Sequence, residues 1–387
     1  MSDPLTVRTL HNGADCQPSC RQPIKIIPHH SGGWTAILFS ENIALLHPTR
    51  EHPALTHRRH EDIADDIRPL LLGQSSSLNR FAIATLVAVD GPAPRDVGAQ
   101  MLITDEQRWG FLSGGCVEDD VARHGREVIA KNKHRLLRYG EGSPWFDIKL
   151  ACGAGISILV EPARIDDPAI ATLLAGYRDR KPVVWQSDGE TRVARYFERT
   201  SPCLPQWNGT SFFAHFEPPL RLVIIGSDAT ALALAGLALH FGTETVLVDP
   251  GGPVNAPFAG LRYQRSADAQ TLPLDSWTAV AVVTHDRESD ESMLAAALAS
   301  DAFYVGAIGA RSRLPSRIER LQQQGVSTAG IERLRAPIGL HGFGKSPQDI
   351  ALSIMSEVMR DFHSRSAQAS AAGVSMSSVA PASVVGR

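Results

Sequence analysis

The sequence predicts an α/β protein with two folded domains, an α+β domain followed by a doubly wound parallel sheet covered by helices. Three observations support this prediction. Short strand-like runs dominate residues 58–198, whereas strand-like and helix-like segments alternate regularly over residues 221–362. Residues 199–220 contain several prolines between the two patterns, which is typical of a linker. A chain of 387 residues is long enough for two domains with separate cores.

The composition indicates a soluble globular protein. Hydrophobic residues make up 43% of the chain and charged residues 20%, which are ordinary values for such a protein. A net charge of −3 gives no reason to expect nucleic acid as a partner, and no apolar run reaches the roughly 18 residues that a membrane-spanning helix needs. The N-terminus lacks a secretory signal pattern, and five scattered cysteines do not suggest a disulfide framework, so we expect a cytoplasmic protein.

Residues 1–57 show no sustained periodicity and are expected to form a poorly ordered or atypical extension. The segment is rich in histidine and contains Cys16 and Cys20, so zinc binding is an alternative, but the spacings match no regular zinc site. A start codon assigned too far upstream is another explanation for these residues.

The first domain, residues 58–198, is predicted to begin with a helix near His60 that Pro69 kinks or ends. Strands are predicted wherever apolar and small residues alternate or short apolar runs occur, at residues 81–89, 101–103, 109–112, 156–160, 183–185 and 191–197. One helix starts at Val117, and a second follows Asp167 and Pro168, a good cap and first helical residue. Residues 199–220 are interpreted as a linker.

The second domain, residues 221–362, alternates predicted strands and helices. The strands cover residues 221–225, 245–249, 279–284 and 303–308, and the helices cover residues 229–240, 288–299, 312–324 and 347–362. Such alternation predicts a parallel sheet with helices on both faces, which is a Rossmann-like fold. The last helix has Ser346 as its cap and Asp349 in position for a capping box. The Ser- and Ala-rich residues 363–387 are expected to be a disordered tail.

The most informative segment is residues 91–118, which read GPAPRDVGAQMLITDEQRWGFLSGGCVE. Here Cys116 follows Gly114 and Gly115 at the start of a predicted helix, where the helix dipole and free N–H groups favour a thiolate. Such a thiol can contact an anionic ligand or a soft metal centre. The alternative for Cys116 is a buried, inert thiol. Cys152, in a glycine-rich turn, is a second candidate for ligand contact.

This segment resembles the N-terminal signature of the XdhC/CoxI family, the accessory proteins that mature xanthine dehydrogenase and related molybdenum hydroxylases. Pro92 stands where the family usually has serine, and the matching residues are 94–95, 98–99, 101 and 113–118. The similarity continues through residues 151–155 and 161–162 and through most of residues 221–360. The resemblance therefore covers roughly residues 60–362 and implies the two-domain fold described above.

The first strand-to-helix turn of the second domain carries half of a dinucleotide-binding fingerprint. Gly226 is present, but Asp228 occupies the position of the glycine that lets a pyrophosphate approach the backbone, and its carboxylate repels phosphate. Asp249 ends the second predicted strand and matches the acid that binds the ribose. The pattern therefore predicts the fold without predicting tight binding of NAD.

Three further segments lie at predicted strand ends or helix starts of this domain, where open α/β sheets bind ligands. They are residues 284–286, 306–311 and 339–346. They resemble the family's THD, YIG-x-IGS-R and GLD-[IL]-G motifs, with Ala310 in place of serine and His341 in place of aspartate. His285, Asp286 and His341 form a metal site in one interpretation and make structural hydrogen bonds in the other.

These segments also supply groups suited to an anionic ligand. Glycines such as Gly309 and Gly344 let a ligand approach the backbone. Arg311 can bind phosphate in a forked geometry, and Lys345 lies beside a helix N-terminus that suits an anion. The alternative is that the glycines only form tight turns and that both cations are solvated.

The resemblance implies that the chain binds the molybdenum cofactor, either molybdopterin itself or a dinucleotide form, protects it during sulfuration and delivers it to an apo-hydroxylase. It also implies a cysteine desulfurase and a second copy of the chain as partners, and a role in binding with no catalytic residue. The molybdenum would lie near Cys116 and the phosphate near Arg311 and Lys345. Arg95 pairs either with a phosphate or with Glu118.

Two other functions are weighed against this one. An NAD(P)-linked oxidoreductase would use the Rossmann-like domain and would require a hydride-transfer centre that the sequence does not display. A scaffold without a small ligand would contact only its target enzyme, and replacing Cys116 would then have little effect.

Overall fold

The structure is a computed structural model. It describes residues 24–28, 34–38, 65–74, 78–141, 143, 150, 153, 155–197, 205–266, 268–284 and 287–373. The chain divides into two compact units, Met1–Arg58 and Arg59–Arg387. In the first unit, β1 (Ile24–Pro28) and β2 (Trp34–Leu38) pair as an antiparallel hairpin. The sequence did not indicate this hairpin, because each strand is only five residues long and lies in a segment without sustained alternation.

The first half of the second unit contains a five-stranded antiparallel sheet in the order β5-β4-β3-β7-β6. Its strands are β3 (Arg80–Asp90), β4 (Gln100–Ile103), β5 (Arg108–Gly110), β6 (Arg135–Tyr139) and β7 (Gly155–Arg164). Helix α2 (Glu118–Lys131) packs against one face, where Val121 and Ala122 contact a core that includes Ala82 and Ala84 of β3. The small residues of β3 thus face α2, since successive side chains of a strand point to opposite faces.

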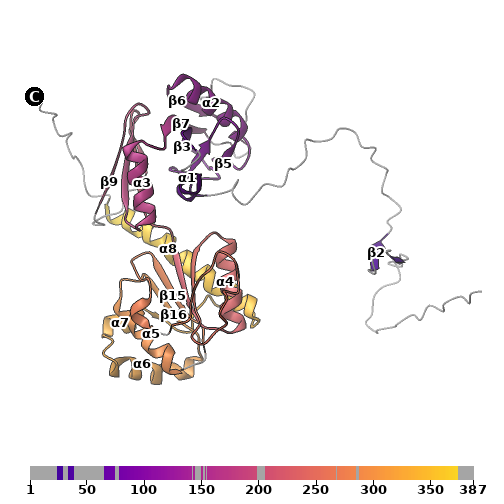
Figure 1. Cartoon of the computed structure of the whole chain (residues 1–387), viewed down its shortest axis with the longest axis vertical. Helices are drawn as coiled ribbons and strands as arrows, with labels where there is room; N and C mark the ends of the chain where they lie inside the picture. The colour runs from indigo at the N-terminus through magenta and orange to yellow at the C-terminus, as the bar shows by residue number, and fades with distance from the viewer. Residues whose placement is uncertain are drawn as a thin grey trace, which may run out of the picture. The chain divides into compact units, whose positions relative to one another are not determined.

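The opposite face of this sheet forms a second core, to which Phe81 and Ile83 of β3 contribute. It packs against α1 (Arg68–Gln74), α3 (Pro168–Arg178) and a four-stranded sheet in the order β10-β11-β8-β9. The strands of that smaller sheet are β8 (Val183–Ser187), β9 (Arg192–Tyr196), β10 (Gln206–Trp207) and β11 (Phe212–Phe216). Figure 1 shows α2 and α3 as separate helices of this half.

The structure differs from three of the expectations for this half. Pro69 is the second residue of α1, where its missing N–H costs nothing, so it starts the helix instead of ending it. Strands β10 and β11 lie inside residues 199–220, which the sequence analysis interpreted as a linker. Phe212 and Ala214 of β11 are buried, β11 pairs with β8, and β10 pairs with β11. The surrounding prolines made these strands hard to predict from the sequence. Strand β6 was also missed.

The second half is a six-stranded parallel sheet in the order β14-β13-β12-β15-β16-β17. Its strands are β12 (Arg221–Ile225), β13 (Glu244–Val248), β14 (Arg262–Gln264), β15 (Thr278–Val282), β16 (Tyr304–Ala307) and β17 (Leu334–Arg335). Numbered along the chain, the strands lie in the order 3-2-1-4-5-6, which is typical of Rossmann sheets. The strand order reverses between β12 and β15, although the strands themselves stay parallel. The Rossmann-like fold predicted from the sequence is therefore confirmed.

Helices cover both faces of this sheet and leave its central strands fully buried. One core includes side chains of α4 (Ala229–His240) and α8 (Pro347–Gly373). The other includes side chains of α5 (Arg287–Ala299) and α6 (Leu314–Gln323), with α7 (Thr328–Glu332) following α6. Short 3-10 turns at Ala269–Thr271 and Arg311–Arg313 complete the half. In Figure 1, α5, α6 and α7 lie on one side of β15 and β16, and α4 lies on the other.

Helix α8 begins where the sequence placed it but ends later. The backbone N–H of Asp349 donates to Ser346 Oγ at 3.1 Å, which is the expected N-cap bond. The Asp349 carboxylate accepts the Ser346 hydroxyl at 2.7 Å, which differs from the predicted capping box, where it would accept the backbone N–H of Ser346. The helix runs to Gly373, so the expectation of a disordered tail from residue 363 is wrong for residues 363–373. Arg365 extends the packing, because its guanidinium donates to Ser276 O and lies 4.7 Å from the centre of the Phe303 ring. Within the described residues, no helix is both long and apolar enough to span a membrane.

Candidate functional site

The loop before α2 is organised around the buried carboxylate of Glu118. One oxygen accepts the backbone N–H groups of Leu112 at 2.8 Å and Ser113 at 2.7 Å. The other accepts the Ser113 hydroxyl at 2.9 Å and the Val117 N–H at 3.2 Å. The loop is therefore wrapped around a carboxylate from its own helix. Burial alone raises the pKa of Glu118, but the hydrogen bonds from Ser113 and Leu112 outweigh burial and hold the pKa below its usual value.

The Ser113 side chain also binds the end of the loop that leads into α2. Its Oγ accepts the backbone N–H groups of Cys116 at 3.1 Å and Val117 at 3.2 Å, so the first N–H groups of the helix entrance are already engaged. Gly114 and Gly115 take φ values of 86° and 115°, a backbone conformation that glycine adopts without strain. These contacts fix the backbone on both sides of the thiol.

The side chain of Cys116 is free and exposed. It lies directly before Val117, the N-cap residue of α2, and therefore near the positive end of that helix. A Cβ atom added at Gly114 would meet no other atom within 4 Å, so the space at this glycine is open. The alternative of a buried thiol is therefore wrong, and the loop presents a sulfur atom that an external ligand can reach.

Arg95 lies near the same loop but does not bind Glu118. Its guanidinium lies 4.2 Å from the centre of the Phe111 ring and pairs with the exposed carboxylate of Asp65. The sequence suggested a phosphate or Glu118 as the partner of Arg95. In the structure the carboxylate that pairs with Arg95 is that of Asp65. Stacking on an aromatic ring holds a guanidinium in place while leaving part of its donor edge free for an anion.

Three of the predicted site residues, Cys152, His285 and Asp286, lie outside the described residues. The metal site considered for His285, Asp286 and His341 therefore stays a hypothesis. In the described part of the chain, no three His, Cys, Asp or Glu side chains lie close enough to hold a metal ion together.

The first turn of the Rossmann half is built for packing. Gly226 follows β12 with φ at 148°, and a Cβ atom there would lie only 2.8 Å from the carbonyl oxygen of Val283. The carboxylate of Asp228 accepts the Ala231 N–H at 2.8 Å and caps α4. This cap takes up an N–H group that a dinucleotide phosphate would use.

Asp249, the expected ribose-binding acid, is buried. Its carboxylate accepts the Tyr263 hydroxyl at 3.2 Å. Gly252 packs so closely that an added Cβ atom would lie 2.1 Å from a carboxylate oxygen of Asp249. Asp228 in the turn after Gly226 and the acid at Asp249 are therefore both engaged by other groups of the same chain.

The structure brings two of the predicted segments together at the carboxyl edge of the sheet. Arg311 and His341 form a hydrogen bond of 2.8 Å between guanidinium and imidazole nitrogens. Gly309 takes φ at 151°, and Gly344 packs against the Asp349 carboxylate. Lys345 is exposed near the start of α8. The carboxyl edge of the sheet is therefore cationic on its solvent side.

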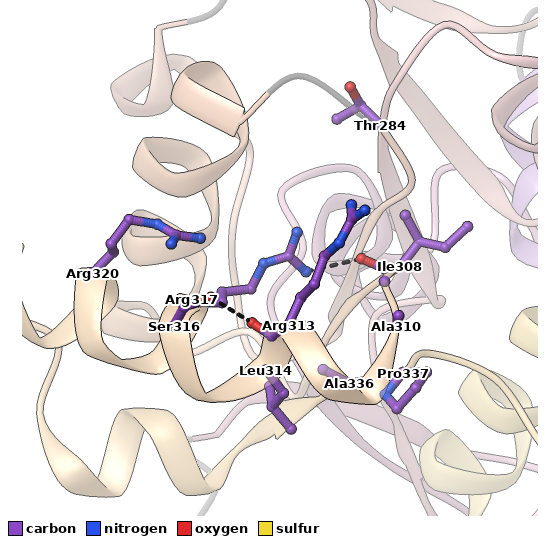
Figure 2. A pocket seen from close by; sticks show the side chains of 11 residues that line it. Thr284, Ile308, Ala310, Arg313, Leu314, Ser316, Arg317, Arg320, Ala336 and Pro337 are labelled. Carbon is purple, nitrogen blue, oxygen red and sulfur yellow. Dashed lines mark hydrogen bonds between the residues drawn. The ribbon is translucent and has the colours of Figure 1, made fainter.

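A cavity of about 250 Å³ opens at this edge, between the segment that follows β15 and the start of α6. Its walls include Thr284, Ile308, Gly309, Arg313, Arg317 and Arg320. Figure 2 shows the three arginine side chains on the same side of the helical segment that carries them. We call this cavity, with Arg313, Arg317 and Arg320, the arginine pocket.

The three arginines differ in how they are held. Arg317 donates to the carbonyl oxygen of Ile308 at 2.9 Å, and Arg320 pairs with Glu291 on α5. Arg313 is exposed and has no hydrogen-bond or ion-pair partner for its side chain among the residues the structure describes. Guanidinium groups around a cavity at the carboxyl edge of a parallel sheet suit a phosphate group.

Neither the arginine pocket nor the role of Glu118 was predicted from the sequence. A signal for the pocket was present, since residues 313, 317 and 320 are spaced so that they share one face of a helix. A signal for Glu118 was weaker, because an acid in the first turn of a helix is expected at the surface. Only the fold shows that its carboxylate turns back into the loop.

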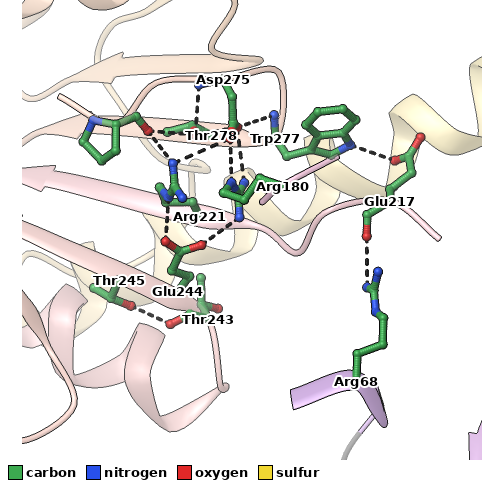
Figure 3. A network of polar contacts seen from close by, with 11 residues as sticks. Arg68, Arg180, Glu217, Arg221, Thr243, Glu244, Thr245, Asp275, Trp277 and Thr278 are labelled. Atoms are coloured by element: carbon green, nitrogen blue, oxygen red, sulfur yellow. Dashed lines mark hydrogen bonds and ion pairs between the residues drawn. The ribbon is translucent and has the colours of Figure 1, made fainter. Parts of the chain in front are cut away.

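A polar network binds the two halves of this unit together (Figure 3). Arg180, just after α3, donates to Glu244 at 2.7 Å and to Asp275 at 2.5 and 3.2 Å. Arg221 donates to the other oxygen of Glu244 at 2.8 Å, and Trp277 Nε1 donates to Glu217 at 3.1 Å.

The charge balance of this network depends on Arg180. Burial raises the pKa of Asp275, but the hydrogen bonds and charge of Arg180 outweigh it, so the pKa lies below its usual value. Arg180 is therefore a residue through which the first half contacts the Rossmann sheet.

Comparison with known proteins gives the family. Residues 76–140 match the XdhC and CoxI family, and residues 222–358 match the XdhC Rossmann domain. The molybdenum cofactor insertion chaperone PaoD of Escherichia coli (strain K12) is 34% identical over 305 residues, which cover 76% of this chain and 89% of that protein. The chain belongs to the XdhC and CoxI family.

Two further proteins are similar to this chain. A Bacillus subtilis (strain 168) protein, named as a probable xanthine dehydrogenase subunit, is 24% identical over 314 residues, covering 72% of this chain and 92% of that protein. A crystal structure described as a xanthine dehydrogenase from Bacillus halodurans superposes with a TM-score of 0.59 at 22% identity, covering 77% of this chain and 96% of that one. The superposition shows that the fold is shared.

We predict that Glu118→Gln destabilises the loop, because an amide places an N–H donor against the N–H groups that the carboxylate accepts. The free energy of unfolding should fall by about 1–3 kcal/mol at neutral pH. The pKa of Glu118 is lowered on folding, so its contribution is full above the usual pKa of a glutamate and is lost as the pH falls through the lowered value. Urea unfolding measured from pH 7 downward should show the two proteins converge. Asp119→Asn, at a 92% exposed side chain, is the control and should change little.

We predict that Arg180→Ala loosens the contact between the halves. It removes three charge-assisted hydrogen bonds from a side chain that is only 11% exposed, which should lower the free energy of unfolding by about 2 kcal/mol. Urea unfolding measures this change. Arg178→Ala, whose side chain is 67% exposed, should stay within about 0.5 kcal/mol of the unchanged protein. Equal effects of both substitutions would contradict the importance of the network.

Proposed function

We propose that this chain is a molybdenum cofactor insertion chaperone. It binds the cofactor as cargo, protects it during sulfuration and delivers it to the apo-form of a xanthine dehydrogenase-type molybdenum hydroxylase. The observation that carries this proposal is the exposed thiol of Cys116 on a loop held rigid by Glu118, in a chain 34% identical to a protein named for the same role.

The Cys116 loop is the part suited to the metal end of the cofactor. A cysteine thiolate is a soft ligand that suits such a metal, and Cys116 lies directly before Val117, the N-cap residue of α2. Because Ser113 and Glu118 hold the backbone on both sides, the sulfur atom is presented without further ordering of the loop. A rigid ligand group lowers the entropic cost of binding the cargo.

The carboxyl edge of the Rossmann half is the part suited to the phosphate end. Arg313 lines a cavity there that is large enough for a phosphate group, and Arg311 and Lys345 add positive charge at the same edge. The same edge takes the phosphate of molybdopterin or the longer chain of a dinucleotide form. NAD is not favoured, because Asp228 caps α4 and Asp249 is buried against Tyr263.

Binding and release are the whole of the proposed role, and no catalytic residue is assigned. The proposed partners are an apo-hydroxylase, a cysteine desulfurase and a second copy of this chain, in the cytoplasm. PaoD is, by its name, a cofactor insertion chaperone, which supports the first of these partners.

We predict that Cys116→Ala weakens retention of the cofactor by on the order of tenfold or more, because it removes the metal-facing group. Purified protein is mixed without oxygen with cofactor released from a molybdenum hydroxylase, separated by gel filtration and analysed for molybdenum. Cys203→Ala removes a thiol to which no role is assigned and is the control. Equal molybdenum in the unchanged protein and the Cys116 variant would remove the thiol from the site, and no molybdenum in either would remove the proposed function.

We predict that Arg313→Ala weakens binding of a phosphate ligand without destabilising the fold, since the side chain is exposed and makes no contact that holds the pocket together. Loss of one charge-assisted contact of about 1.5–3 kcal/mol corresponds to roughly a 10- to 100-fold weaker affinity for pyrophosphate. Isothermal titration calorimetry at two salt concentrations measures it. Arg262→Ala, at an exposed residue of β14, is the matched control. The same loss in both variants would indicate binding by general charge alone.

A further inference from the structure

The contacts that join the two halves lie at the amino ends of the Rossmann strands. Arg221, Glu244 and Thr278 are the first residues of β12, β13 and β15. Arg180 binds Glu244 and also Asp275, which accepts the Thr278 hydroxyl at 2.8 Å. The first half is thus fastened to one edge of the parallel sheet.

The cationic edge proposed for the cofactor lies at the other end of the same strands. Gly226 directly follows β12, Thr284 comes two residues after β15, and Ile308 directly follows β16. A five-residue strand is about 16 Å long, at about 3.3 Å per residue. The arginine pocket is therefore separated from the Arg180 network by the full length of the sheet.

In the first half, the Cys116 loop is also separated from the Arg180 network. Leu112 and Val117 belong to the core between the five-stranded sheet and α2. Helix α3, which leads to Arg180, packs against the opposite face of that sheet, with Leu173 in the second core. A β-sheet layer therefore lies between the Cys116 loop and the helix that meets the Rossmann half, and packed layers are about 10 Å apart.

These placements keep Cys116 and the arginine pocket of one chain too far apart for one small cofactor to contact both. We propose that a complete cofactor site is formed by two copies of the chain, with Cys116 of one copy and the arginine pocket of the other. The inference rests on the proposed function. Every chain carries both groups, so a second copy supplies the missing one, and a twofold axis then forms two equivalent sites.

Mixed dimers of two variants test this arrangement. One chain carries Cys116→Ala and the other Arg313→Glu, and different affinity tags allow the mixed dimer to be isolated. The mixed dimer, the dimer of each variant alone and the unchanged dimer are incubated without oxygen with cofactor released from a molybdenum hydroxylase. Molybdenum per dimer is then measured. Dimers of either variant alone should be nearly empty. The mixed dimer has one site with both groups intact and should hold about half the molybdenum of the unchanged dimer.

A second mixed dimer gives the opposite expectation. It pairs an unchanged chain with a chain that carries both substitutions, so each shared site lacks one group and should stay empty. A site built within one chain would instead leave this dimer half-loaded and the first mixed dimer empty, and that result would overturn the inference. A loaded monomer would overturn it too. If the unchanged protein itself retains no molybdenum, the proposed function fails. Failure of the shared site alone is therefore distinguishable, because the unchanged dimer then still holds molybdenum.

Discussion

The buried carboxylate of Glu118 is the interaction on which the thiol-bearing loop depends. A carboxylate removed from water is unfavourable unless its oxygens accept hydrogen bonds, and here four donors from residues 112–117 supply them. The same contacts leave the loop little freedom to rearrange. Cys116 is consequently exposed on a rigid support, which suits a group that must meet a cargo and later release it.

The Rossmann half keeps the strand order of dinucleotide-binding proteins while using its ligand edge differently. In such proteins the first turn approaches a pyrophosphate, but here Asp228 caps α4 and Asp249 is packed beneath Gly252. The positive charge lies farther along the edge, on Arg311 and in the arginine pocket. A shared fold thus accommodates another ligand because the binding groups are on loops and helix starts, not on the buried strands.

Local signals in the sequence predicted much of this structure. The bounds of β12 and α4 were predicted to the residue, because a run of four apolar residues at 222–225 and a following capped helix are strong short-range patterns. The N-cap role of Ser346 at the start of α8 was also predicted correctly. Strands β10 and β11 were missed, because pairing stabilises these short strands beside prolines: β10 pairs with β11, and β11 pairs with β8, which is distant along the chain.

The sequence by itself determined the family signature, the parallel sheet of the second half and the position of Cys116 before a helix, because each depends on residues close together along the chain. Only the tertiary structure decided that Glu118 turns inward, that Asp249 is buried, and that Arg180 meets Glu244 and Asp275 across the two halves. Those outcomes depend on which layers pack together and which strand ends meet. Periodicity along a chain carries no information about such long-range geometry.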